Sequence, residues 1–435
     1  MTTFDQILPQ VVETLNPHAA GLGGVDRIII NRDLNGRVRL IVSDQVRADT
    51  AVTGVIATVA EELARRLGAH AFAAERTVLF EEDLEAVIDG RPCIPLEPFE
   101  NVCVVDRLAT EGDWASIAPV ADGVPRMVFF SIKGGVGRST ALAASAWALA
   151  QAGKRVLVLD LDLESPGLSS ALLPDERRPA YGIADWLVED LVDNGEAVFG
   201  DLIATSTLAH DGEIYVAPAH GRDPGEYVAK LGRVWMSKSA PDGSRESWSR
   251  RLCRLIDAME ARWRPDLILI DSRAGIDEVA SSCVTDLGAG LVLLFSVDGE
   301  QTWTGYRLLF RHWHKAGVAR EIRERLQLVG AMVPDDERRV AHFEGMRERA
   351  WDTFAGDLYD EIPAGKVGGE YWNFEESDEG APHYPWTIRW NRGFAALLSL
   401  HTRFETIDAT EVDTVFGPLI SGLLGSLPGL GEGHG

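Results

Sequence analysis

A glycine-rich turn between two apolar runs is the feature that most constrains how this chain can fold. Residues 126–163 read RMVFFSIKGGVGRSTALAASAWALAQAGKRVLVLDLDL. An apolar run at Met127–Phe130 leads into the turn, an alanine-rich helix follows it, and a second apolar run ends at Asp160 and Asp162. A strand, a turn, a helix and another strand in this order predict a βαβ unit. Two acidic residues are then expected at the carboxyl end of the second strand.

The turn has a composition that suits a polyphosphate and a metal ion. It consists of Lys133, Gly134, Gly135, Val136, Gly137, Arg138, Ser139 and Thr140. Its three glycines permit backbone angles that point successive N–H groups into one concavity, and the N-terminus of the following helix adds its dipole. The hydroxyl of Ser139 can ligate Mg²⁺, and Lys133 and Arg138 place a cation on either side. A tight turn without a ligand is the alternative, and a lone glycine cluster would leave that alternative competitive.

The second part of the chain repeats apolar runs between helical segments. The expected strands lie at residues 213–217, 267–270, 290–297 and 326–333, and helices are expected near 182–192 and 250–262. Apolar strands that alternate with helices indicate a mostly parallel sheet with helices on both faces. We therefore predict an α/β domain over residues 126–400, of the P-loop or Rossmann-like type. Residues 365–390 are expected to form a long surface loop, and residues 401–435 a short helix and a flexible tail.

The first part of the chain has a different pattern. Residues 1–99 predict a small α+β domain, because Asn35-Gly36 between two β-rich runs is a hairpin signal and residues 50–67 have helical periodicity. Short strands are also expected at 77–80 and 84–88. Nothing in this part has catalytic spacing, so a docking or regulatory module is the expectation. Proline, glycine and acidic residues predict a linker at 100–125.

Composition narrows the class of protein. The 435 residues carry a net charge of −25, which argues against a nucleic-acid partner, since phosphates are bound by lysine and arginine. No apolar run approaches the roughly 20 residues that span a bilayer, so no membrane insertion is expected. The four cysteines form no CxxC pair, a usage that favours a reducing cytoplasm with neither zinc nor a disulfide.

With these motifs in order, residues 126–400 resemble the deviant Walker-A P-loop ATPases of the MinD/ParA type, whose pattern is KGGxGK[ST]. The turn looks most like a KGGVGR variant of that pattern. The resemblance implies ATP and Mg²⁺ as ligands and an ATP-dependent homodimer. It implies that Lys133 reaches the phosphates of the partner subunit and that Asp162 polarises the attacking water. Asp160 and Asp271 match acids at the metal site, with Asp271 acting through water, and the amide of Gly275 would sense the γ-phosphate.

The chain departs from this family pattern at three places. Arg138 stands where the pattern has lysine, and its planar fork does not replace an ammonium group, so ATP binding is better supported than fast hydrolysis. DSRAG replaces the usual DTPPG, which leaves Arg273 either on the γ-phosphate or partner, or in an ion pair with Asp277 or Glu278. No asparagine follows the late strand, so the sequence does not identify the base that the site prefers. Residues 333–335 and 362–363 are expected to lie near the base. Asp160 alone could also cap a helix.

Three functions fit this reading of the sequence. The first is a slow ATPase that acts as a dimerising switch and engages a protein partner through the N-terminal domain, in a bacterial regulatory or defence system. The second is a metabolic enzyme of the same superfamily that acts on a small carboxylic acid. The third is a positioning ATPase on DNA or a membrane, which the acidic charge and the apolar, acidic C-terminal segment disfavour.

Overall fold

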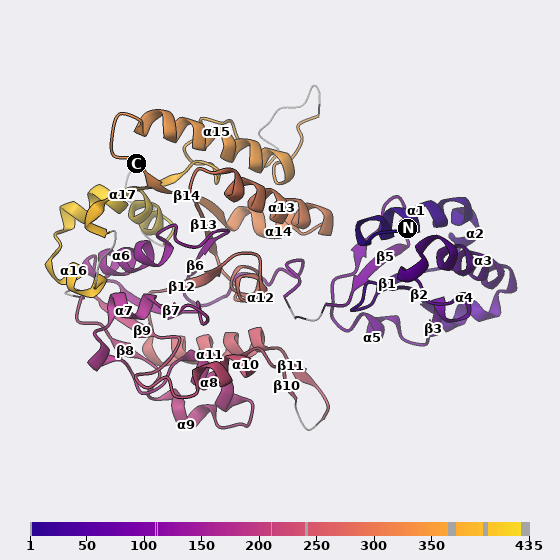
Figure 1. The fold of residues 1–435 in the computed structure, drawn as a ribbon, viewed down its shortest axis with the longest axis horizontal. Helices are drawn as coiled ribbons and strands as arrows, with labels where there is room; N and C mark the ends of the chain where they lie inside the picture. Colours follow the sequence, from indigo (N-terminus) through magenta and orange to yellow (C-terminus); the bar gives the residue numbers. More distant parts are fainter. Residues whose placement is uncertain are drawn as a thin grey trace. The chain divides into compact units, whose positions relative to one another are not determined.

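The chain forms two compact units in a computed structural model. The structure describes residues 2–108, 110, 112–209, 211–239, 242–363, 371–394 and 399–427. The first unit contains Met1–Ser116 together with Lys315–Val318, and the second contains Ile117–His314 and Ala319–Gly435 (Figure 1). Among the described residues, no helix combines the length and the apolar character needed to cross a membrane.

The first unit is built on a five-stranded sheet of order β3-β2-β1-β5-β4. Its strands are β1 (Ile28–Arg32), β2 (Val38–Ser43), β3 (Val78–Glu81), β4 (Ile94–Pro95) and β5 (Val102–Asp106). The predicted hairpin is confirmed, because β1 and β2 pair antiparallel. Its turn is held by the Asp33 carboxylate, which accepts hydrogen bonds from the N–H groups of Asn35 and Arg37. Gly36 takes the positive φ of 79° that the turn needs.

Helices cover this sheet and close its core. They are α1 (Ile7–Leu15), α2 (Ala19–Leu22), α3 (Thr50–Leu67), α4 (Ala74–Thr77) and α5 (Leu84–Ile88). The helix predicted at 50–67 is confirmed: the Asp49 side chain caps its first turn, and Gly68 ends it with a φ of 56°. The strand predicted at 84–88 is wrong. Asp83 accepts from the N–H groups of Glu85 and Ala86, and such an N-cap starts a helix.

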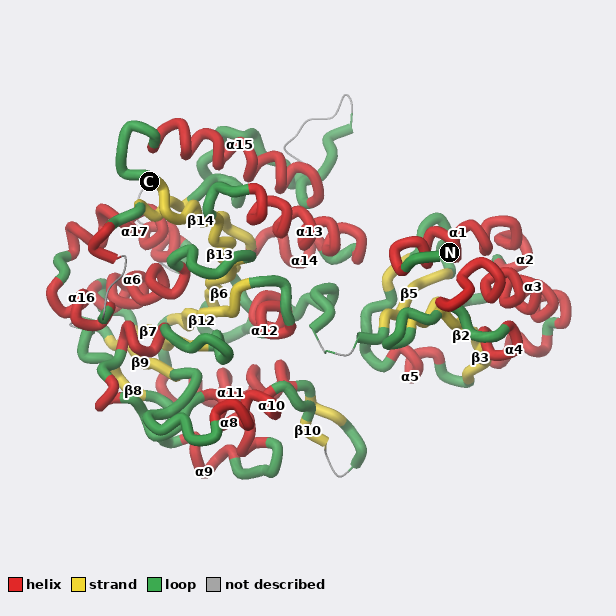
Figure 2. Tube along the Cα trace, viewed as in Figure 1, coloured by secondary structure: helices red, strands yellow, loops and turns green. Residues whose placement is uncertain are grey.

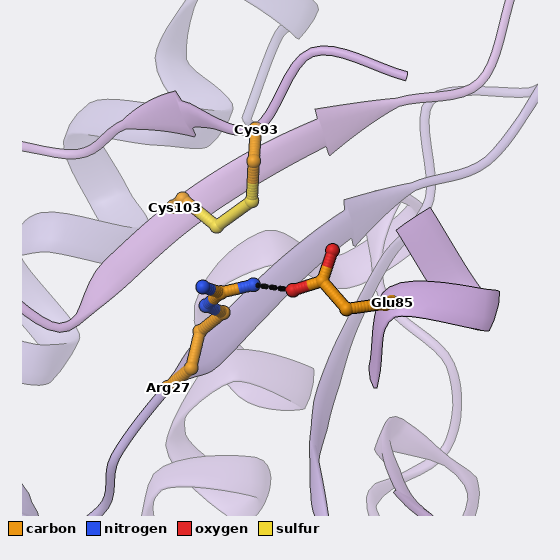
Figure 3. Close-up of a disulfide and its surroundings, with 4 residues drawn as sticks. All are labelled: Arg27, Glu85, Cys93 and Cys103. Atoms are coloured by element: carbon orange, nitrogen blue, oxygen red, sulfur yellow. Dashed lines mark hydrogen bonds and ion pairs between the residues drawn. A yellow bond between two sulfur atoms is a disulfide. The ribbon is translucent and has the colours of Figure 1, made fainter. Parts of the chain in front are cut away.

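Two further predictions for this part of the chain are corrected. The linker expected from residue 100 cannot begin there, because Val102–Asp106 is strand β5 and pairs parallel with β1. The absence of a disulfide was also wrong: Cys93 and Cys103 are joined, with their Cα atoms 5.5 Å apart (Figure 3). The antiparallel pairing of β4 with β5 places Pro95 opposite Cys103, which brings Cys93 close. Sequence spacing alone does not contain this strand register.

The second unit is built on an eight-stranded sheet of order β15-β14-β13-β6-β12-β7-β9-β8. The strands are β6 (Arg126–Ser131), β7 (Arg155–Asp160), β8 (Ala204–Thr205), β9 (Glu213–Ala217), β12 (Leu267–Ala274), β13 (Leu291–Ser296), β14 (Leu326–Val333) and β15 (Trp386–Arg389). All neighbouring pairs are parallel except the edge pair of β8 with β9. The predicted mostly parallel sheet is therefore confirmed.

Helices lie on both faces of this sheet, as Figure 2 shows by red helices on either side of the yellow strands. They are α6 (Arg138–Gln151), α7 (Leu168–Leu172), α8 (Ile183–Asp190), α9 (Gly195–Phe199), α10 (Tyr227–Val234), α11 (Trp248–Trp263), α12 (Glu278–Ser281), α13 (Glu300–Ala316), α14 (Ala319–Ile322), α15 (Arg339–Asp357), α16 (Leu400–Thr406) and α17 (Ala409–Gly425). Neighbouring residues of β6 show the alternation of a buried strand. Phe129 belongs to the core shared with α6 and α17, whereas Phe130 meets Tyr306 of α13.

The C-terminal part of the unit differs from prediction. The helix predicted beyond residue 401 is present as α17, but it is not separate from the domain, because its 17 residues bury Phe416, Leu419 and Leu423 in the same core as α6. Residues 386–389 form edge strand β15 instead of part of the predicted surface loop. Trp372, also in the predicted loop, packs against Tyr359 with the ring centroids 5.2 Å apart. Residues 364–370 and the end of the predicted tail, 428–435, lie outside the described residues.

Candidate functional site

The turn between β6 and α6 presents a row of unused backbone donors. Gly135 and Gly137 have φ values of 74° and 81°, in the region that favours glycine. Helix α6 starts at Arg138 without a side-chain cap. Across the described residues, the N–H groups of 133–140 have no acceptor in the protein. Such uncapped N–H groups at a helix N-terminus attract an anion.

A cavity of about 460 Å³ lies beside this turn at the carboxyl ends of β6, β7 and β12. Its lining is Ser131, Gly134, Gly135, Val136, Gly137, Arg138, Ser139, Thr140, Asp162, Ser165, Arg273 and Ala274. The structure thus brings most of the predicted site residues together around one hollow. Lys133, Asp160, Asp271 and Gly275 are not part of the lining.

Arg138 does not extend freely into the cavity. Its Nε donates to Asp271 Oδ1 at 2.6 Å, its Nη2 to Asp162 Oδ2 at 3.2 Å, and its Nη1 to the hydroxyl of Ser131 at 3.2 Å. Burial alone would lower the pKa of Arg138, but the charges and hydrogen bonds of the two carboxylates outweigh it and raise that pKa. The arginine therefore stays charged and links the acids that follow β7 and end the regular part of β12.

Ser139 and Asp271 have a geometry that fits Mg²⁺. The hydroxyl of Ser139 donates to Asp271 Oδ2 at 2.6 Å, which leaves its oxygen lone pairs for a cation. Oδ1 of Asp162 is buried and has no hydrogen-bond partner among the described residues. No group of three acidic, histidine or cysteine side chains that could hold a metal occurs in the described part of the chain. Mg²⁺ here would depend on ligand phosphate oxygens and water, as is usual for this ion.

Asp160 has an environment unlike that of the other two acids. It is fully buried, and its Oδ2 accepts from the N–H and the hydroxyl of Ser169 in the first turn of α7. Burial and the nearby charge of Asp271 raise the pKa of Asp160 to about 7. Burial likewise raises the pKa of Asp162, although Arg138 acts in the opposite direction. The helix-capping alternative for Asp160 is thus seen directly in its contacts.

Lys133 and Gly275 lie outside the lining of the cavity, whereas Arg273 is part of it. Lys133 is exposed at the front of the turn. The N–H of Gly275 donates to the carbonyl of Ser131 at 2.9 Å, so it is engaged within the protein. Arg273 forms ion pairs with Asp277 at 3.3 Å and with Glu164 at 2.6 Å. The pair with Asp277 was one of the alternatives for Arg273, whereas Glu164 comes from another loop and has no signal in the sequence.

A second cavity, of about 560 Å³, lies near the expected base contacts. Pro334 and Asp335 after β14 line it together with Trp390 and Asn391 after β15. Residues 362–363 are exposed and do not line it. One strand, β13, separates β14 from β6, so the axes of β6 and β14 are about 10 Å apart.

Comparison with known proteins identifies the domain that carries the turn. The family of CobQ/CobB/MinD/ParA nucleotide-binding domains matches residues 127–340. Comparison with curated proteins gave no match. Solved structures that are similar include a ParA family ATPase from Chlorobium tepidum TLS, with 15% identity, 68% of this chain and 98% of that chain covered, and a TM-score of 0.42.

A second similar structure is the septum site-determining protein MinD complexed with Mg-ADP from Pyrococcus horikoshii OT3. The two share 20% identity, the match covers 72% of this chain and 100% of that chain, and the TM-score is 0.41. A third is pNOB8 ParA bound to nonspecific DNA, with 16% identity and a TM-score of 0.42; the match covers 69% of this chain and 96% of that chain. The family match includes the glycine-rich turn, Asp162 and Asp271. The domain formed by residues 127–340 of this chain therefore belongs to the CobQ/CobB/MinD/ParA family of nucleotide-binding domains.

Proposed function

We propose that the second unit binds ATP with Mg²⁺, hydrolyses it slowly and acts as a nucleotide-driven dimerising switch. The observation that carries this proposal is that residues 134–140, whose N–H groups have no acceptor among the described residues, line a cavity beside the Ser139–Asp271 contact. Backbone donors at a helix start and an oxygen pair for a hard cation are what a nucleoside triphosphate requires. The family of the domain supports a nucleotide as the ligand.

Each backbone amide and side chain of the site has one role in this proposal. The amides of Gly134–Thr140 would hold the phosphates, and the hydroxyl of Ser139 would hold Mg²⁺, with Asp271 supporting it through water. The cation would supply charge neutralisation at the transferred phosphoryl group. Asp162 would orient the attacking water with the oxygen that has no partner here. The amide of Gly275 must leave the carbonyl of Ser131 before it can contact a γ-phosphate.

The exposed position of Lys133 supports a shared site between two copies of the chain. This residue precedes the cradle and does not line the cavity of its own subunit. In the described part of the chain, its ammonium group forms no ion pair or hydrogen bond. We therefore assign Lys133 to the nucleotide of the partner subunit. The first unit, in which no catalytic pattern occurs, is assigned to docking of a protein partner.

The mass of the protein with ATP tests this switch. Asp162→Ala should slow hydrolysis and trap the ATP form, so light scattering with ATP and Mg²⁺ should show a mass that doubles from 47.5 kDa. The matched control is the double variant with Lys133→Ala as well, which should bind ATP but remain a monomer. An unchanged mass of the single variant, with ATP demonstrably bound, would sink the dimer proposal.

A further inference from the structure

Arg138 places its positive charge beside the cavity at the turn. Its guanidinium group joins two carboxylates that come from different strands, those of Asp162 and Asp271. Its side chain is only 7% exposed, and it also lines the cavity beside the turn. A positive charge is thus already present between the acids and the place where phosphates are proposed to bind.

The number of donors on this side chain is what makes a bridge feasible. A guanidinium group carries five N–H bonds in a plane, two on each terminal nitrogen and one on Nε. Three are used on Asp271, Asp162 and Ser131. One hydrogen on each terminal nitrogen therefore has no acceptor among the described residues. These two hydrogens can be donated to phosphate oxygens while the carboxylate contacts persist.

A lysine at the same position could not do this. An ammonium group is a single point with three donors, so contact with phosphate would draw it away from at least one of the two carboxylates. Arg138 is held by both, and moving a buried charge away from its partners is unfavourable. The guanidinium group should therefore remain between the acids when a ligand enters the cavity.

We infer that Arg138 is a resident cation of the site, which lets the triphosphate of a nucleotide bind with little dependence on a divalent metal. This inference rests on the proposed function, because it concerns the binding step of the same nucleotide. Mg²⁺ then serves hydrolysis and contributes little to affinity. The proposal assigns a binding role to the arginine that distinguishes this chain from the lysine pattern.

Metal dependence of nucleotide affinity tests the inference. A fluorescent ATP analogue carrying a methylanthraniloyl group is titrated into the full chain, once with Mg²⁺ and once with EDTA. The dissociation constant of the unaltered protein should change by less than roughly threefold between the two conditions. For Arg138→Lys, EDTA should weaken binding by roughly tenfold or more, because the point charge cannot serve acids and phosphate together.

Arg155→Lys is the matched control. Arg155 lies at the opposite end of the sheet, 45% exposed and paired with Asp266, so this variant should behave like the unaltered protein. Thermal unfolding checks that both variants are folded. If Arg138→Lys does not fold, the ratio measured for the unaltered protein still decides the question.

Two results would overturn the inference, and they differ from failure of the proposed function. A loss of tenfold or more in EDTA for the unaltered protein would show that the metal, and not Arg138, carries the affinity. An equal, small metal effect in Arg138→Lys would show that arginine is not needed. If the unaltered protein binds the analogue under neither condition, the nucleotide proposal itself fails, and this inference falls with it.

Discussion

Arg138 and Asp271 carry opposite charges in a part of the site that solvent hardly reaches, since 7% and 1% of their side chains are exposed. Taking two charges out of water is costly, and the cost is recovered only when both partners stay in place. Ser139 contributes a further hydrogen bond to the same carboxylate. These buried contacts therefore decide how well the second unit tolerates substitution at the site.

Removal of the arginine should destabilise the second unit. Arg138→Ala leaves the buried carboxylate of Asp271 without its ion-pair partner, which typically costs about 3–5 kcal/mol. The control Arg155→Ala removes an exposed partner of Asp266 and should cost less than about 1 kcal/mol. Urea unfolding followed by tryptophan fluorescence measures both free energies of unfolding. Equal losses for the two variants would contradict the buried pairing.

For individual residues, the sequence predicted which ones come together at the cavity but not all of the contacts that they form. The turn and Asp162 meet at one cavity because the carboxyl ends of parallel strands share an edge of the sheet. The ion pair of Arg138 with Asp271 was not foreseen, since the turn was taken to hold phosphate with both of its cations. Sequence spacing also says nothing about Glu164 and Arg273, which meet only because two loops fold toward each other.

Among the elements, the strong local signals were predictive. Largely apolar runs such as Leu326–Val333 are strands, and the helix at Thr50–Leu67 has the predicted bounds, with Asp49 as its N-cap and Gly68 at its end. Elements whose type depends on tertiary contacts were missed. The run of Leu84–Ile88 could be either a strand or a helix by its apolar residues, and the cap at Asp83 settles it. Strand β15 is short and forms only through its pairing with β14.

The disulfide beside β5 gives a prediction about thiols. Because Cys93 and Cys103 are joined, the denatured but unreduced protein should show two reactive thiols, those of Cys253 and Cys283. Prior reduction should raise the number to four. Thiol titration with a chromogenic disulfide reagent measures this number. Four thiols without reduction would contradict the bond. With a sequence separation of 10, such a crosslink typically stabilises a domain by about 3 kcal/mol.

At the scale of the whole molecule, the two units have separate hydrophobic cores. Residues of β1, β2, α1 and α3 form one core, and those of β6, α6 and α17 form another. All residues that line the cavity at the turn belong to the second unit. The net charge of −25 disfavours nucleic acid, whereas backbone amides hold a nucleotide even in an acidic protein. The division into two units could be predicted from composition and motif order, whereas the docking role of the first unit stays a prediction.

Calorimetric titration with ATP and Mg²⁺ tests the central claim, that the turn at 133–140 is a nucleotide site. The informative variant is Gly137→Val, because a β-branched residue is strained at a φ of 81° and the turn must then rotate its amides. Gly153→Val is the matched control, with a similar φ of 77° and equally open surroundings at the far end of α6. We predict that the unaltered protein and the control bind ATP alike, and that Gly137→Val weakens binding by roughly tenfold or more. No binding by the unaltered protein, or equal binding by all three proteins, would contradict the account.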